Sequence, residues 1–152
     1  MPGDRPPPPA RTLFAVTGPT AAAGVCGLLD SEPYPDPVSR LPDAIAPDGS
    51  EIRYLVLEAN RASLVEVSLK PGAVTRPVRH RTVEEIWYFL AGTGTVWLDG
   101  EVVDVVRGST VVIPTGRAFQ FRSSGDEALR FLCYTSPPWP GNDEAETVDT
   151  GA

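Results

Sequence analysis

"RHRTVEEIWYFLAGTG", residues 79–94, holds the chain's only histidine and decides the fold. His80 is followed by Glu84 and Glu85, then by the aromatic run 87–89, and then by glycines at positions 92 and 94. An aromatic and aliphatic run that stops at a glycine turn is typical of a β-strand. The stretch therefore predicts a strand that carries carboxylates and aromatic rings close to one imidazole.

Similar short runs continue on both sides of this strand. Turn residues separate them, and Asp99–Gly100 between two apolar runs is a strong signal for a β-hairpin. The further runs are 51–58, 63–70, 94–100, 101–106, 109–114, 118–123 and 129–135. Eight strands in so short a stretch leave no room for crossover helices. The pattern predicts an all-β sandwich or barrel.

Length and proline content divide the chain. Its 152 residues, 41% of them apolar, suit a single domain, and eleven of its 17 prolines lie within the first 50 residues. We expect a disordered Pro-rich arm, an extended segment that packs on the barrel or on a partner subunit, the barrel, and a loop-like Pro/acidic tail whose three prolines exclude a sheet strand. Their ranges are 1–12, 13–50, 51–136 and 137–152.

Charge and cysteine content exclude several classes of protein. The net charge is −7, but residues 51–135 carry ten acids and ten bases, so the acidity lies at the ends. This distribution gives no footprint for nucleic acid or an anionic membrane. Two distant cysteines support neither a disulfide framework nor a zinc ribbon. With no long apolar run and no signal-peptide pattern, we expect a cytoplasmic location.

The glycine and proline spacings carry a family resemblance. Residues 72–92 contain a glycine, five residues, x-x-His80, four residues, Glu85, six residues and a glycine. Gly108, Pro114 and Gly116 keep a second such frame. These frames resemble the two motifs of the cupin superfamily, and residues 48–147 resemble small bacterial single-domain cupins. The resemblance implies a cupin-type double-stranded β-helix (a jelly-roll barrel) and a homodimer, and the proline-rich sequence adds the extended N-terminal arm.

The same resemblance raises the question of a metal. It implies that His80 and Glu85 occupy ligand positions, but Val78 and Phe119 stand where two further histidines belong. Apolar side chains cannot replace those donors, so we expect no metal and no other cofactor. The alternative is a metal-dependent oxygenase with an atypical ligand set. Such a set would add Cys133, Tyr54 or Glu84 to the remaining pair.

Side-chain alternation predicts a pocket inside the barrel. His80 and Glu85 would form an acid/base pair, which suits a metal-independent isomerase, cyclase or lyase acting on a small organic metabolite. The pocket walls would bind this substrate. They are predicted to be Val78, Trp87, Phe89, Phe119, Phe121 and Cys133. The alternative is a non-catalytic ligand-binding or structural cupin, in which His80 is a hydrogen-bonded structural residue and the aromatic rings fill the core.

The tail contains a large aromatic residue, Trp139, which is unfavourable to leave in water. We expect it to fold back over the mouth of the barrel or into a subunit contact. The acids Asp143, Glu144 and Glu146 would then lie within reach of the basic residues between positions 76 and 81. Deleting the tail should therefore reduce stability.

Overall fold

The computed structural model describes residues 41–149 and 151. The predicted arm at 1–12, and the segment 13–50 up to residue 40, lie outside the described residues. Within the described part, strands dominate and the helical content is a single 3-10 turn, Asn142–Glu144. No helix there has the length and apolar character needed to cross a bilayer.

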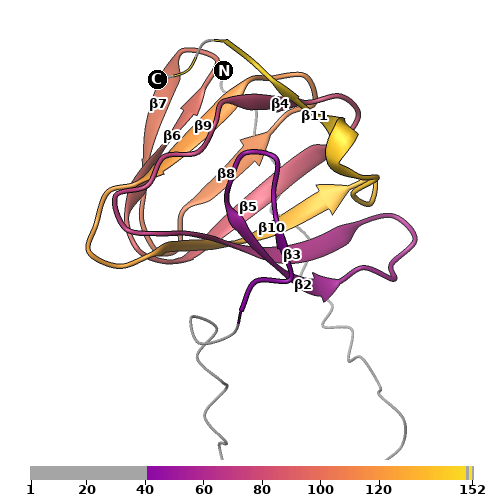
Figure 1. The fold of residues 1–152 in the computed structure, drawn as a ribbon, viewed down its shortest axis with the longest axis horizontal. Coiled ribbons are helices and arrows are strands. Elements are labelled where there is room, and N and C mark those ends of the chain that lie inside the picture. The colour runs from indigo at the N-terminus through magenta and orange to yellow at the C-terminus, as the bar shows by residue number, and fades with distance from the viewer. Residues whose placement is uncertain (1–40, 150, 152) are drawn as a thin grey trace, which may run out of the picture. The chain divides into compact units, whose positions relative to one another are not determined.

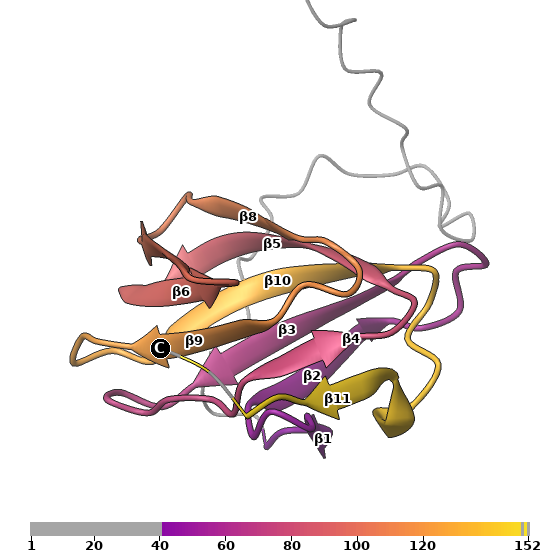
Figure 2. The same ribbon diagram turned by 90° about the horizontal axis from the view of Figure 1, so that it is seen from above.

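Two antiparallel sheets face each other (Figures 1 and 2). The first has the order β1-β2-β3-β10-β5-β8 and the second β11-β4-β9-β6-β7. The strands of the first sheet are β1 (Ala44–Ile45), β2 (Glu51–Val56), β3 (Ser63–Leu69), β10 (Leu129–Ser136), β5 (Glu84–Ala91) and β8 (Thr110–Ile113). Those of the second are β11 (Ala145–Thr147), β4 (Val78–His80), β9 (Phe119–Ser123), β6 (Gly94–Leu98) and β7 (Glu101–Val105). The all-β jelly-roll prediction is confirmed.

The eight runs singled out in the sequence all form strands, and three strands come in addition. One of the additions corrects the prediction for the tail: β11 pairs with β4, matching Ala145 with His80 and Thr147 with Val78. The inference from the prolines was wrong because proline removes only its own N–H. Residues 145–147 keep their N–H groups and are free to pair.

The predicted hairpin joins β6 to β7. Asp99 and Gly100 have φ values of 46° and 96°, so both lie in the left-handed region that a two-residue hairpin turn requires. Gly94, at the other end of β6, is needed for a different reason. A Cβ at this position would lie 2.1 Å from the carbonyl oxygen of Arg122, because β6 and β9 approach closely there.

Alternation along the strands builds the core. On β5, Glu85, Trp87 and Phe89 are buried, whereas the residues between them face solvent. Trp87 stacks on Phe131 with ring centroids 4.4 Å apart, and Phe121 meets Phe131 edge-on at 5.3 Å. This aromatic cluster fills one part of the space between the sheets. A cavity lies beside this cluster and is lined in part by Trp87, Phe121 and Phe131.

Candidate functional site

The cavity has a volume of about 390 Å³. Its lining comes from both sheets, from the segment 44–48 that contains β1, and from the segment 138–142 that follows β10. Most of the lining side chains are apolar or aromatic. A concave apolar pocket with a few polar groups is the usual form of a small-molecule site.

His80 projects from β4 into this cavity and is only 4% exposed. Its ring meets Phe119 edge-on at 5.0 Å and Trp139 edge-on at 5.3 Å. Its Nδ1 atom is buried and has no hydrogen-bond partner. Nδ1 therefore does not make the hydrogen bond, to Glu85 or to a backbone carbonyl, that the structural alternative for His80 requires.

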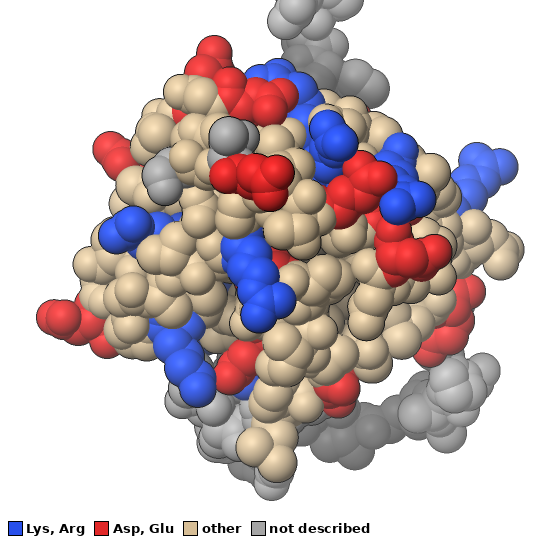
Figure 3. Space-filling model, turned by 45° about the horizontal axis from the view of Figure 1, so that its top comes forward, with Lys and Arg blue, Asp and Glu red and all other residues tan. Residues whose placement is uncertain are grey.

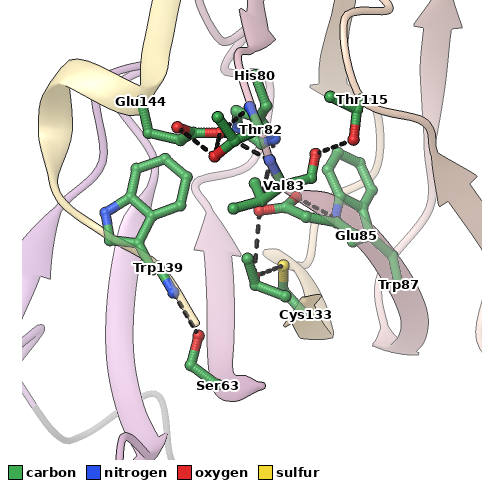
Figure 4. A network of polar contacts seen from close by, with 11 residues as sticks. Ser63, His80, Thr82, Val83, Glu85, Trp87, Thr115, Cys133, Trp139 and Glu144 are labelled. Carbon is green, nitrogen blue, oxygen red and sulfur yellow. Dashed lines mark hydrogen bonds and ion pairs between the residues drawn. The ribbon is translucent and has the colours of Figure 1, made fainter. Parts of the chain in front are cut away.

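Glu85 supplies the facing carboxylate, and its two oxygens are held separately. Trp87 Nε1 donates to Oε2 at 2.8 Å (Figure 4). The Thr135 hydroxyl donates to Oε1 at 3.3 Å. Oε1 also lies 3.8 Å from His80 Nδ1, which is too far for a hydrogen bond. The fold thus brings the predicted pair together and fixes the carboxylate, but leaves a gap between the two groups.

A second acid reaches the cavity from the segment before β2. Asp48 is half-buried, and its carboxylate accepts hydrogen bonds from the backbone N–H and the hydroxyl of Ser50. Burial raises the pKa of Asp48, while the Ser50 hydrogen bonds and the charges of His80 and Arg76 partly oppose this effect. Sequence reasoning missed Asp48 because a proline-rich extended segment gives no sign of which side chain faces the barrel.

The tail reaches the site through Trp139 and Glu144. The Trp139 backbone N–H donates to Ser63 Oγ at 3.2 Å, and its ring covers one side of His80, which confirms that it folds back onto the barrel. Glu144 Oε1 accepts hydrogen bonds from the backbone N–H groups of Thr82 and Val83 (Figure 4). The Thr82 hydroxyl adds a third donor. The tail thereby anchors the loop that joins β4 to β5.

Opposing effects act on the Glu144 carboxyl, which is only 4% exposed. Burial raises its pKa, but the hydrogen bonds from Thr82 and Val83, together with the charge of His80, outweigh burial and hold the pKa below its usual value. The neighbouring Glu146 pairs with Arg79 at 2.9 Å and Arg81 at 3.1 Å. The predicted contact between the tail acids and the basic residues at 76–81 is therefore confirmed for Glu146, whereas Glu144 binds Thr82 and Val83 instead.

Five of the six predicted wall residues line the cavity, and Phe89 does not. The five are Val78, Trp87, Phe119, Phe121 and Cys133. Phe89 is fully buried in the aromatic cluster, 4.9 Å from Phe131. Alternation correctly places Phe89 on the inner face of β5, but alternation says nothing about depth along the strand. Polar lining residues that the sequence did not indicate include Ser50, Ser63, Thr135 and Asn142.

The donors present do not fit a metal bound by three protein ligands. Val78 and Phe119 line the cavity near His80 and offer no donor atom. Within residues 41–149 and 151, no group of three His, Cys, Asp or Glu side chains is placed to hold a metal ion. Of the other donors considered for an atypical set, Cys133 and Tyr54 line the cavity and Glu84 is exposed. We therefore derive no step through a metal.

Cys133 lines the cavity and is buried, so its reactivity tests whether the cavity is closed to solvent. Its Sγ lies 3.6 Å from the Thr135 hydroxyl, and burial, reinforced by the negative charge of Glu85, raises the pKa of the thiol well above its usual value. With Cys26 replaced by serine, we expect iodoacetamide at pH 9 to modify the folded protein at least about tenfold more slowly than the unfolded protein, because the thiolate is the reactive form. Mass spectrometry over time measures both rates. Equal rates would show that the thiol is open to solvent.

Comparisons with known proteins agree with this architecture. A family model described as "Cupin domain" matches residues 65–135. The uncharacterized protein MJ1618 of Methanocaldococcus jannaschii is 35% identical over 103 residues, which span 65% of this chain and 82% of that protein.

Solved structures of two other proteins have a similar fold. The polyketide cyclase RemF of Streptomyces resistomycificus superposes with a TM-score of 0.58 at 25% identity, covering 75% of this chain and 79% of that chain. The nucleoside dehydratase Pac13 of Streptomyces gives a TM-score of 0.57 at 16% identity, covering 66% of this chain and 79% of that chain, a likeness of fold alone.

Proposed function

The chain belongs to the cupin superfamily, and from that premise we propose that it is a metal-independent enzyme that moves a proton within a small organic molecule. The reaction class is isomerisation, cyclisation or elimination, with His80 and Glu85 as the acid/base pair. One observation carries the proposal. A buried, unpartnered imidazole nitrogen lies 3.8 Å from a fixed carboxylate at the wall of a cavity large enough for a ligand.

Leaving a buried polar atom without a partner costs about 1–3 kcal/mol, which is commonly tolerated where a ligand will supply the partner. The two donors on Glu85, Trp87 and Thr135, hold the carboxylate in place before any ligand binds. Preorganised groups of this kind need no rearrangement when charge develops. The pair therefore has the features of a site prepared for proton transfer.

The chemistry follows from the positions of the groups. His80 takes a proton from a substrate carbon next to a carbonyl group, and the imidazolium that forms is stabilised by the Glu85 carboxylate. His80 then returns this proton to another substrate atom, or to a hydroxyl group that leaves as water. The apolar walls exclude bulk water while the charged intermediate exists. RemF is a polyketide cyclase, and cyclisation falls within this reaction class.

Deuterium exchange tests this proposal without knowledge of the natural substrate. Small ketones and β-hydroxy ketones, with and without an amino group, are incubated with the protein in D2O, and exchange at the α-carbon is followed by NMR. We expect at least one compound to exchange faster than without protein. Replacing His80 by glutamine should reduce that rate by about 10²–10⁴-fold, the usual contribution of a general base.

Two controls make the result specific. Glu84→Gln alters the exposed acid next to Glu85 and should leave the rate unchanged, whereas Glu85→Gln should lower it. Treatment with EDTA should have no effect. Exchange that persists in His80→Gln would contradict the proposed base. A rate lost with EDTA and restored by one metal equivalent would favour the metal-dependent alternative, and binding without exchange would favour the non-catalytic one.

A further inference from the structure

The cavity carries an unusual set of charges. Among the residues that the structure describes, its lining includes two acids, Asp48 and Glu85, and one basic side chain, His80. Neither acid forms an ion pair with a lysine or arginine within the described part of the chain. Arg76, whose charge acts on Asp48, is itself exposed and does not line the cavity. Two carboxyl groups therefore face the cavity, and no lysine or arginine among its described lining residues balances them.

The face of the molecule drawn in Figure 3 does not show the same bias. Acidic and basic side chains are interspersed there over a largely uncharged surface. Arg79 and Arg81 are already paired with Glu146 from the tail. These two arginines therefore do not supply positive charge to the cavity.

Aromatic rings surround the acids. Tyr54, Trp87, Phe119 and Trp139 all line the cavity, and two of them pack edge-on against His80. The face of an aromatic ring attracts cations, and the attraction is strongest where water is excluded. Carboxylates in a cavity lined by aromatic rings form a setting that stabilises a positive group and penalises a negative one.

We propose that the ligand of this cavity is an organic cation, a small molecule that carries an ammonium group next to an aromatic or alicyclic body. The proposal rests on the proposed function in one respect, since it assigns the substrate class to the same cavity. His80 Nδ1 and Glu85 Oε1 are 3.8 Å apart. An ammonium nitrogen placed roughly 2.9 Å from Glu85 Oε1 donates to that oxygen, and His80 Nδ1 stays free to act as the base of the proposed reaction.

A matched set of three probes tests the charge preference. Tryptamine, tryptophol and indole-3-acetate share an indole body and differ mainly in a side chain that ends in an ammonium, a hydroxyl or a carboxylate. Calorimetry at 0.15 M salt, where long-range attraction is screened, measures each affinity. We expect tryptamine to bind at least about tenfold more tightly than tryptophol, the effect of one charge-assisted hydrogen bond, with indole-3-acetate weakest.

Variants that lack one carboxylate identify the residues responsible for the preference for the ammonium probe. Glu85→Gln and Asp48→Asn each remove a cavity charge with little change in shape and should bring the affinities for tryptamine and tryptophol closer together. Glu101→Gln removes an exposed acid on β7 and should change neither affinity. A preference that survives both cavity variants would overturn the proposal. So would equal affinities, tighter binding of the anion, or no binding by any of the three.

The two proposals can fail separately. An ammonium preference that depends on Glu85, in a protein that exchanges no substrate proton, would retain the ligand class and reject the acid/base function. Exchange on neutral ketones together with equal affinities for the three indoles would retain the function and reject the ligand class.

Discussion

Removal of residues 137–152 is expected to lower the free energy of unfolding by at least about 4 kcal/mol. The deletion removes β11, which provides three of the residue pairs along β4, whereas β9 provides one. It also removes the Glu144 carboxylate from Thr82 and Val83, and the Trp139 ring from His80. Urea unfolding followed by circular dichroism measures the loss.

A shorter deletion serves as the control for this experiment. Removing residues 149–152 keeps β11, Glu144 and the hydrogen bond from Val148 N–H to the Pro77 carbonyl, so stability should change by less than about 0.5 kcal/mol. If both deletions unfold at the same urea concentration as the intact protein, the tail is not an integral part of the barrel. The longer deletion should also abolish binding in the cavity.

Replacing Glu144 by glutamine is expected to lower the free energy of unfolding by about 2 kcal/mol at pH 7, because hydrogen bonds to a buried charged group weaken when the charge is removed. The pKa of Glu144 is lower in the folded protein than in the unfolded chain. Its ionised form therefore stabilises the fold above the unfolded value of 4.5, and this contribution disappears as the pH falls through the folded pKa. Unfolding curves measured from pH 7 downwards should show the two proteins converging.

Glu146→Gln is the matched control, since Glu146 lies two residues away and forms only surface ion pairs with Arg79 and Arg81. Such pairs contribute at most about 1 kcal/mol. A Glu144 effect no larger than that of Glu146, or one that does not diminish below pH 4.5, would show that Glu144 does not anchor the loop after β4.

Local pattern was sufficient for much of the fold. Alternation and turn residues identify all eight main strands, and Asp99–Gly100 forms the hairpin that its composition predicts. The strands that escaped prediction are short and depend on a partner. β4 and β11 have three residues each and support one another, and neither is distinguishable from a loop by composition alone.

Local sequence pattern also reveals only part of the candidate site. His80, Glu85 and Trp87 belong to one continuous stretch, so their proximity could be inferred from strand geometry. Asp48 and Glu144 come from segments on either side of the barrel sequence and reach the site only through tertiary pairing. Trp139 was expected at the barrel because an exposed indole is unfavourable, but its contact with His80 required the structure. The homodimer stays a prediction.

The pairing of β4 with β11 also has a consequence during synthesis on the ribosome. His80 leaves the exit tunnel well before Ala145, its partner across the sheet, has been translated. Until then β4 presents an unpaired edge, and the aromatic interior beside it stays open to water and to other nascent chains. Chaperone contact and aggregation should therefore concentrate in the interval between translation of β10 and translation of β11.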